Sequence, residues 1–327
     1  MTDPAPILEL IDAFRRSKTM FTAVSLGIFD GERPQGVAMN RLLDACVALG
    51  LLTKRGDEYI NTPLADEYLA RSSPRTLSGY VRNSNDALYR LWEHLEEAVI
   101  EGTNRWEQTF GAGGSLFTHF FRTPEAKRDF LMGMHGFGMI SSPAVVAAFD
   151  LSRFTSMVDL GGATGHLALA ALDRYPSMKA TVFDLPSVMD VAKEHVDDRV
   201  ALIAGDFFVD PLPAGDLYAV GRILHDWTEA KIVLLLDKIF AALPKGGGLL
   251  IAEKLLKEDR SGSVTTHMQS LNMLVCTEGR ERTLSEYSAL LRGAGFQDIE
   301  GYVTGAPLDA ILALKPTAAM IGGPTIE

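Results

Sequence analysis

The chain has 327 residues, of which 47% are hydrophobic and 22% charged, and its formal net charge is −11 at pH 7. This length predicts two domains, and the balance of apolar and charged residues is that of a globular protein. The acidic charge and the lack of any long Lys or Arg run disfavour nucleic-acid binding, because phosphates would be repelled.

Two cysteines, Cys46 and Cys276, lie far apart in the sequence and lack the spacing of metal ligands. We therefore expect neither a disulfide framework nor a metal site. The N-terminus has no signal-like apolar core, and no run of about 18 apolar residues predicts a transmembrane helix. The sequence predicts a cytoplasmic protein without a membrane partner.

The first 150 residues predict a mainly helical domain. Residues 52–61 predict a hairpin that turns at Arg55-Gly56-Asp57, and Thr62-Pro63 predicts the start of a helix. Helix, hairpin and helix in this order indicate a winged-helix module. The helices are expected at 7–29, 42–52, 87–101, 115–121 and 124–148.

From Met157 onward, apolar runs alternate with helical patterns, which predicts an α/β fold with a Rossmann-like, doubly wound parallel sheet. One helix is expected at 229–243, and a capping box at Thr283 and Glu286 opens another. The last two strands, joined by Thr304-Gly-Ala-Pro307, should pair antiparallel at the sheet edge. The strands are expected at 157–160, 179–183, 200–204, 217–221, 248–253, 298–303 and 308–314. The predicted domains are 1–150 and 151–315, followed by a tail at 316–327.

Three strand ends carry residues typical of a nucleotide-like ligand site. In Asp159-Leu-Gly-Gly-Ala-Thr-Gly165, the glycines Gly161, Gly162 and Gly165 allow a tight turn and a close approach to a ligand. Asp184 ends the second strand, where an acid can accept both ribose hydroxyls. Gly205, Asp206 and Phe207 end the third strand, where an acid and an aromatic ring can clamp an adenine.

NAD and S-adenosylmethionine (SAM) are the competing cofactors. The glycine spacing is not the G-x-G-x-x-G that seats a pyrophosphate on a helix N-terminus. The carboxylate of Asp159 would repel a pyrophosphate but suits the ammonium of an amino acid. SAM carries that ammonium and no phosphate, so the residues favour SAM.

His225, in Arg222-Ile-Leu-His-Asp-Trp227, follows the fourth strand and should face the same crevice. A histidine has an unperturbed pKa of about 6.5 and can take a proton from a hydroxyl near neutral pH. Glu253 and Glu281 are the candidates to orient its ring. In the alternative interpretation, His225 caps the helix that follows and the two glutamates are surface acids.

These motifs resemble the acetylserotonin O-methyltransferase-like family, within the SAM-dependent small-molecule O-methyltransferases. The similarity spans nearly the whole chain. It rests on Asp159–Gly165, Val182-Phe-Asp-Leu-Pro186, Gly205-Asp-Phe-Phe208, Arg222–Trp227, Ser270-Leu-Asn-Met-Leu274 and Thr277-Glu-Gly-Arg-Glu-Arg-Thr283.

The resemblance implies a winged-helix N-terminal domain that forms an intertwined homodimer, and a Rossmann-like catalytic domain that needs no metal. It implies SAM binding by Asp184, Gly205, Asp206, Phe207 and Arg222. It also implies that His225 is the base between Glu253 and Glu281. Asp226 and Asn272 would contact the acceptor, and Met20 and Phe21 would reach into the partner's pocket.

The chain departs from the family at four places. Cys276 stands where the vertebrate enzyme has a glutamine that contacts acetylserotonin. Gly138 replaces a tryptophan, Phe121 replaces a tyrosine, and the segment 30–39 is short by about one helix. The three substitutions remove hydrogen-bond donors and open space, so they argue against acetylserotonin itself as the acceptor.

We expect a SAM-dependent O-methyltransferase that acts on a hydroxyl of a small aromatic acceptor and releases S-adenosylhomocysteine (SAH). Two other classes stay open at this point. One is an enzyme of the same fold that uses SAM without transferring its methyl, for a rearrangement, a decarboxylation or a hydroxylation. The other is a winged-helix regulator.

Overall fold

The computed structural model describes residues 2–33, 36–111 and 113–317. Contacts divide the chain into two compact units, and each unit combines two segments. Unit 1 is Met1–Glu93 with Gly111–Phe137, and unit 2 is His94–Phe110 with Gly138–Glu327.

This division differs from a single boundary near residue 150, because residues 94–110 pack with the sheet-bearing unit. The Arg105 N–H donates to the Val275 carbonyl (2.9 Å), and the Trp106 indole donates to the Cys276 carbonyl (2.8 Å). The limits 1–150 and 151–315 stay predictions about domains. Of the predicted tail, residues 318–327 lie outside the described residues.

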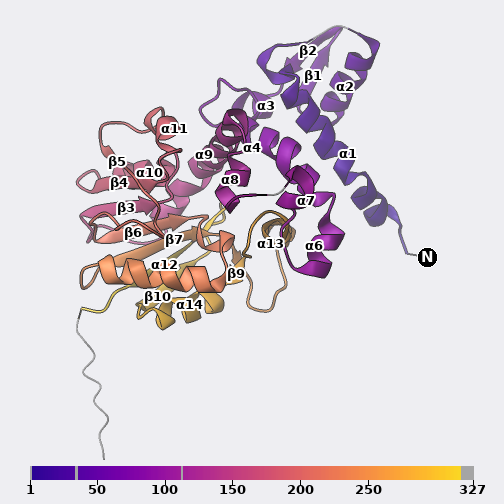
Figure 1. The fold of residues 1–327 in the computed structure, drawn as a ribbon. Helices are drawn as coiled ribbons and strands as arrows, with labels where there is room; N and C mark the ends of the chain where they lie inside the picture. The colour runs from indigo at the N-terminus through magenta and orange to yellow at the C-terminus, as the bar shows by residue number, and fades with distance from the viewer. Residues whose placement is uncertain (1, 34–35, 112, 318–327) are drawn as a thin grey trace, which may run out of the picture. The chain divides into compact units, whose positions relative to one another are not determined.

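Unit 1 is mainly helical and contains a β-hairpin (Figure 1). The hairpin pairs Leu52 with Asn61 and turns at Gly56, whose φ of +60° suits glycine, as predicted. Thr62 caps the next helix by accepting the Ala65 N–H. The elements are α1 (Ala5–Ser25), η1 (Ile28–Asp30), α2 (Val37–Ala48), β1 (Leu52–Arg55), β2 (Glu58–Asn61), α3 (Pro63–Tyr68), α4 (Ser78–Asn83), the π-helix η2 (Ser84–Leu88), α5 (Tyr89–Trp92) and α8 (Leu116–Phe120).

Three helix predictions need correction. The helix expected at 42–52 runs instead from Val37 to Ala48, because Gly50 is left-handed (φ +72°) and Leu52 already begins β1. The helix expected at 7–29 ends at Ser25, because Gly27 adopts a left-handed conformation (φ +70°) before the turn η1. The single helix expected at 87–101 is wrong, since the backbone leaves the helical region at His94 (φ −109°, ψ 26°). No glycine or proline lies at this break, and the helical spacing of apolar residues continues across it, so the sequence predicted a single helix.

Unit 2 contains, within the described residues, a seven-stranded sheet of order β10-β11-β7-β6-β3-β4-β5. Five neighbouring strands are parallel, and β11 and β10 pair antiparallel at one edge, as predicted. The strands are β3 (Ser156–Leu160), β4 (Lys179–Asp184), β5 (Val200–Ala204), β6 (Leu217–Gly221), β7 (Gly248–Glu253), β10 (Gln297–Tyr302) and β11 (Asp309–Leu314). The strand order reverses between β3 and β6, which is where ligands bind in such sheets.

Figure 1 shows the helices of unit 2, several of which flank its sheet. They are α6 (Leu95–Glu101), α7 (Trp106–Phe110), α10 (His166–Arg174), α11 (Met189–Lys193), η3 (Leu224–Asp226), α12 (Glu229–Ala242), α13 (Val264–Cys276) and α14 (Leu284–Gly293). A short parallel pair, β8 (Leu255–Leu256) with β9 (Arg282–Thr283), was not predicted, because two-residue strands leave no pattern. The capping box of Thr283 and Glu286 at α14 is confirmed.

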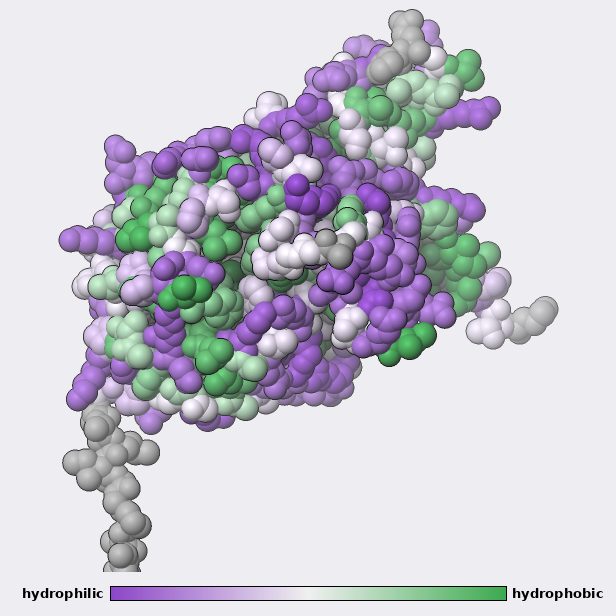
Figure 2. All heavy atoms as spheres, viewed as in Figure 1, coloured by the Kyte–Doolittle hydropathy of each residue, from purple (hydrophilic) through white to green (hydrophobic). Residues whose placement is uncertain are grey.

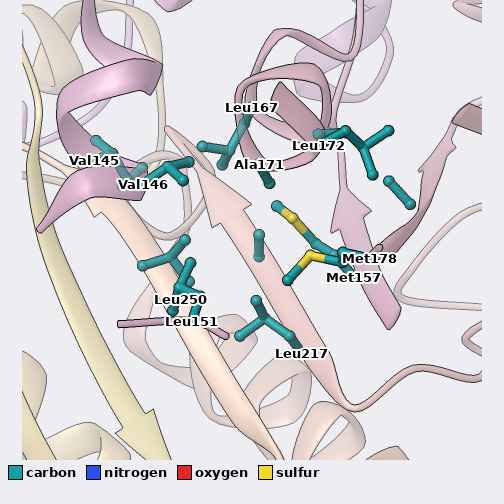
Figure 3. Packing of buried hydrophobic residues seen from close by; sticks show 14 of the residues in the cluster. Val145, Val146, Leu151, Met157, Leu167, Ala171, Leu172, Met178, Leu217 and Leu250 are labelled. Atoms are coloured by element: carbon teal, nitrogen blue, oxygen red, sulfur yellow. The ribbon is translucent and has the colours of Figure 1, made fainter. Parts of the chain in front are cut away.

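The core of unit 2 lies between α10 and the central strands (Figure 3). Leu167, Ala171 and Leu172 on one face of α10 meet apolar side chains of β3, β6 and β7. Burying each such leucine contributes about 1.5–3 kcal/mol, which holds the strand ends in fixed positions relative to one another.

The helix α9 (Pro124–Ala147) runs from unit 1 into unit 2. Among the described residues it is long and apolar enough, by length and composition, to cross a membrane. Core helices of globular proteins meet the same criterion, and Val145 and Val146 at its end belong to the core of unit 2. The absence of a membrane partner remains a prediction.

Candidate active site

The glycine loop after β3 makes a tight turn that brings three strand ends together. Gly161 (φ +66°) and Gly165 (φ +73°) are left-handed, as the turn requires. A Cβ on Gly161 would lie 2.5 Å from Ile223 and 3.5 Å from the Phe207 ring. The loop therefore packs directly against the segments that follow β6 and β5.

Asp159 lies near the end of β3 with 1% of its surface exposed. Its carboxyl packs against Gly162, where a Cβ would lie 2.6 Å from the carboxyl carbon. Among the described residues, its Oδ2 atom has no hydrogen-bond partner. Burial raises the pKa of this carboxyl to about 7, and the nearby Asp184 adds to the rise. A cation beside Asp159 would relieve this penalty.

Asp184 ends β4 and ties the glycine loop to this strand. Its Oδ2 accepts the Ala163 N–H (2.8 Å) and its Oδ1 accepts the Leu185 N–H (2.7 Å). Burial raises its pKa to about 6, although these two hydrogen bonds act in the opposite direction. Each carboxylate oxygen has a second lone pair, so Asp184 can still accept hydroxyl groups of a ligand.

Gly205, Asp206 and Phe207 follow β5, as predicted. The Gly205 N–H donates to the Asp184 carbonyl (2.9 Å), and Asp206 accepts the Phe208 N–H (2.8 Å). A Cβ on Gly205 would meet the Phe183 ring at 2.4 Å, so this position requires glycine. The structure thus places Gly205 and Asp206 beside the end of β4, and Phe207 beside the glycine loop.

His225 lies in the 3₁₀ turn η3, directly after β6. Arg222 begins this turn with a φ of +56°, unusual for a residue with a side chain, and its N–H donates to the Ala252 carbonyl (3.0 Å). Because Ile223 touches the glycine loop, the turn that carries His225 adjoins the predicted cofactor site.

The imidazole of His225 is 2% exposed, and its Nδ1 lies 2.7 Å from Oε1 of Glu281. Its Nε2 lies 3.6 Å from Oδ1 of Asp226. Burial by itself lowers the pKa of His225, but the charges of Glu281, Asp226 and Glu253 outweigh it and raise this pKa to about 9. Because the carboxylate accepts at Nδ1, the neutral ring carries its proton there and offers Nε2 as the base. The alternative that His225 merely caps a helix is wrong, since Thr228 provides the N-cap of α12.

Glu253, at the end of β7, contacts the main chain of the His225 turn. Its Oε1 accepts the N–H groups of Ile223 (3.1 Å), Leu224 (2.6 Å) and His225 (3.2 Å). Its other oxygen accepts the Tyr287 hydroxyl. Neither glutamate is a surface acid, because Glu253 and Glu281 are each 1% exposed. The sequence alone did not distinguish the roles of the two glutamates. In the structure, Glu281 binds the imidazole ring and Glu253 binds the main chain of the turn.

His225, Glu253 and Glu281 also form a group whose donor atoms lie within 4.8 Å of one another. Such a group resembles a metal site by composition. Here Nδ1 of His225 and Oε1 of Glu281 bind each other, and Glu253 is engaged by the turn and by Tyr287. Each of the three side chains therefore has a protein hydrogen-bond partner, and the absence of a metal remains a prediction.

The predicted acceptor-side residues Asp226, Asn272 and Cys276 lie on η3 and α13. Asn272 and Cys276 are one helical turn apart, and the Asn272 amide donates to the Cys276 sulfur (3.5 Å). Burial raises the pKa of Asp226 to about 6 and that of the Cys276 thiol well above its ordinary value, and Asp226 contributes to the latter. Cys276 is therefore a neutral, buried thiol at neutral pH.

Other predicted positions lie on other elements of the chain. Met20 and Phe21 are half-buried on α1 in unit 1, where they pack on that unit's core. Phe121 directly follows α8, and its ring contacts that of Phe117. Gly138 lies on α9, where a Cβ would come within 2.2 Å of the His166 ring. The segment 30–39 includes residues 34–35, which lie outside the described residues.

Sequence reasoning missed the contacts of Tyr287 and Gly279 with this site. Gly279 approaches the His225 carbonyl so closely that a Cβ would lie 2.2 Å away. The glycine in Thr277–Thr283 was the available signal for this close approach. Tyr287 lies on the buried face of the amphipathic helix α14, where an aromatic residue is expected to pack in the core. Nothing in the sequence therefore indicates that its hydroxyl binds Glu253.

Comparisons with known proteins agree with this geometry. The O-methyltransferase domain family matches residues 92–297. Acetylserotonin O-methyltransferase of Bos taurus is 42% identical over 334 residues, covering 94% of this chain and 96% of the relative. The enzyme of Homo sapiens is 40% identical over 332 residues, covering 94% and 96%.

Solved structures agree as well. Human N-acetylserotonin methyltransferase in complex with SAM superposes with a TM-score of 0.92 at 40% identity, covering 97% of this chain and 99% of that chain. PigF with SAH gives a TM-score of 0.87 at 26% identity, covering 96% and 100%. The resemblance that the motifs indicated is confirmed, and the chain belongs to the family of SAM-dependent O-methyltransferases.

Proposed function

We propose that this O-methyltransferase transfers the methyl group of SAM to a hydroxyl of a small aromatic acceptor, with His225 as the general base. One observation carries this proposal: a buried imidazole, oriented through Nδ1 by Glu281, lies on a turn that touches the glycine loop after β3. A base beside a cofactor loop is what deprotonation of an acceptor hydroxyl requires.

The residues around the glycine loop fit SAM. The buried Oδ2 of Asp159, unpaired within the described parts of the chain, is an acceptor for an ammonium group. Asp184 keeps lone pairs for ribose hydroxyls, and Phe207 beside Gly161 offers an aromatic face for a base. Gly161 and Gly162 leave no room for a Cβ, so the main chain itself can line the site.

The bound cofactor supplies a methyl group that its sulfonium has already activated. The chain therefore has to hold the acceptor in line and remove its proton. Nε2 of His225 takes the hydroxyl proton, and the Nδ1 proton stays in the hydrogen bond to Glu281, which stabilises the imidazolium. Positioning contributes much of the rate in such a transfer.

The acceptor is proposed as a small, flat aromatic hydroxyl compound. Asp226 and Asn272 supply polar groups next to His225 and the neutral thiol of Cys276. The names of the relatives support an indole-type acceptor, but Cys276 and Gly138 replace the larger family residues. Phenols and N-acylated indoles are therefore the first acceptors to test.

We also propose a homodimer through unit 1. The N-terminal half of α1 exposes Ile7, Leu8, Leu10, Ile11 and Phe14, each by more than half, and Figure 2 shows them as a green patch on the helix labelled α1 in Figure 1. Such an apolar stripe is expected to be covered by another chain. The winged-helix character of this unit, the reach of Met20 and Phe21 into a partner's pocket, and a cytoplasmic location remain proposals from the sequence.

Methyl transfer is favoured over the other two classes. Relatives of 40–42% identity over nearly the whole chain are named as methyltransferases, which supports transfer rather than a rearrangement, a decarboxylation or a hydroxylation. The acidic charge of −11 supports an enzyme rather than a DNA-binding regulator.

The first experiment is calorimetric titration with SAM and with SAH, followed by measurement of SAH release with phenols and N-acylated indoles. We expect Asp184→Ala to weaken cofactor binding at least about tenfold. His225→Ala should lower kcat by about 10²–10⁴ and keep SAH affinity within about twofold, since a general base contributes that factor. His94→Ala is the matched control, because His94 is a partly exposed histidine that lies beside Glu97. Near-normal turnover of His225→Ala would refute the proposed base.

A further inference from the structure

The turn that carries His225 is held from two sides by one stretch of chain, Arg282–Tyr287. On one side, the guanidinium of Arg282 donates to the Leu224 carbonyl (3.5 Å). On the other side, the hydroxyl of Tyr287 donates to Glu253, whose Oε1 accepts the three N–H groups of residues 223–225. The contacts therefore fix both the carbonyl and the amide groups of the turn.

Tyr287 is placed accurately by its own local sequence. It is the residue after Glu286, which completes the capping box at the start of α14. Its ring has no exposed surface, and the Arg282 guanidinium lies 5.9 Å from the ring centroid. A capped helix start leaves the phenol little freedom to move away from Glu253.

The hydrogen-bonding capacity of Glu253 is nearly filled. A carboxylate has about four acceptor sites, and Glu253 receives three main-chain N–H groups and one phenol. It is 1% exposed, so water does not replace a lost donor. If the phenol is removed, Oε2 of Glu253 loses its donor, and the carboxylate is held in place by the N–H groups of the turn alone.

We propose that Tyr287 is a positioning residue for methyl transfer: its hydroxyl holds the Glu253 carboxylate, which fixes the main chain of the His225 turn. Tyr287 and Glu253 set where the ring stands, and Glu281 sets how it is turned. This inference rests on the proposed role of His225 as the base. A shift of the base by about 1 Å can cost about 10² in rate, so the effect belongs in kcat rather than in cofactor affinity.

The test is Tyr287→Phe, which deletes one oxygen and keeps the ring. The matched control is Tyr218→Phe, because Tyr218 is also fully buried and its hydroxyl donates to a main-chain carbonyl, that of Pro213. We expect Tyr287→Phe to lower kcat about 10–100-fold with KM for SAM changed by less than about twofold, and Tyr218→Phe to keep kcat within about twofold. A drop in kcat of equal size in both variants would overturn the proposal, as would a kcat for Tyr287→Phe within about twofold of the wild type.

A double-mutant cycle with Glu253→Gln separates positioning from general packing. If Tyr287 acts through Glu253, adding Tyr287→Phe to Glu253→Gln should lower kcat by less than about twofold more. If the two factors multiply instead, the proposed chain of contacts is wrong. Should Tyr287→Phe fail to fold, Glu253→Gln alone decides: unchanged kcat overturns the proposal, and a loss in kcat at constant KM for SAM supports it.

The failure of this inference can be told apart from the failure of the proposed function. If His225→Ala retains turnover, the assignment of the base fails whatever Tyr287→Phe does. If His225→Ala loses turnover while Tyr287→Phe does not, only the role of Tyr287 fails.

Discussion

Replacing Glu281 by glutamine should shift the pH dependence of the reaction toward lower pH. In the wild type the pKa of His225 is about 9, because the charges of Glu281, Asp226 and Glu253 outweigh the lowering effect of burial. Only the neutral ring accepts a proton, so the rate should rise with pH until about pH 9. A raised pKa means that His225 is protonated at neutral pH in the free protein, about 99% at pH 7.

The size of the shift follows from the 2.7 Å contact between His225 and Glu281. A buried hydrogen bond to a charged group contributes about 1.5–3 kcal/mol, and one pKa unit corresponds to 1.36 kcal/mol, so its loss lowers the pKa of His225 by about one to two units. The limb of the pH–rate profile should move from about 9 to between about 7 and 8. The plateau should fall about 10–100-fold, because the imidazolium loses its countercharge in the transition state.

The assay is kcat from SAH release between pH 6 and 10, with an acceptor whose hydroxyl does not ionise in that range. The ratio of wild-type to Glu281→Gln rates should shrink as pH falls, since more of the variant's imidazole is neutral there. Glu278→Gln is the matched control: it removes a carboxylate from the same loop, but one that pairs with Lys231 at the surface (2.7 Å). A limb that stays near pH 9 in Glu281→Gln, or that moves upward, would refute this reasoning.

Three further predictions concern single residues. Asp159→Asn should weaken SAH binding at least about tenfold in calorimetry. It should also stabilise the apoprotein at pH 8 by up to about 4 kcal/mol. The pKa of Asp159 is raised from 3.8 to about 7 in the fold, so ionising this carboxyl above pH 3.8 destabilises the folded state of the wild type. Equal stability of variant and wild type in urea at pH 8 would contradict this. Gly138→Ala should lower Tm in the wild type, because the added Cβ would lie within 2.2 Å of the His166 ring. In a His166→Ala background the same change should raise Tm, because alanine favours a helix more than glycine does. A change in Tm of the same sign in both backgrounds would exclude a clash with His166. Phe14→Glu, on the exposed stripe of α1, should convert a dimer into monomers in sedimentation velocity, and an unchanged dimer would place the interface elsewhere.

Local patterns predicted the elements that frame the site. Most strands of the sheet in unit 2 are short apolar runs between glycine, proline or acidic residues, although β10 is mostly polar. All seven strands were found within one or two residues of their expected ends. The glycines of Gly161–Gly165 predicted a turn that no larger residue can make, and Gly161 and Gly165 are left-handed there. The break at His94 was missed, because helix breaks without glycine or proline leave no local signal.

The roles of the two glutamates were beyond any local pattern. Glu253 and Glu281 are 28 and 56 residues from His225 in the sequence; Glu253 ends β7, whereas Glu281 lies in a polar loop. Which of them meets the ring depends on how β7 and the loop after α13 are placed against β6. The role of Tyr287 could not be predicted for the same reason, since its partner Glu253 lies on a strand 34 residues away in the sequence.

By itself, the sequence determined the parallel sheet, the cofactor loop, the family and His225 as the candidate base, because those features depend on periodicity and on residues close together in the chain. Only the tertiary structure decided that Glu281 binds the imidazole while Glu253 binds the main chain of the turn. The physical reason is that hydrogen bonds are directional and short, so a carboxylate acts on whichever donor the packing of distant elements brings within about 3 Å.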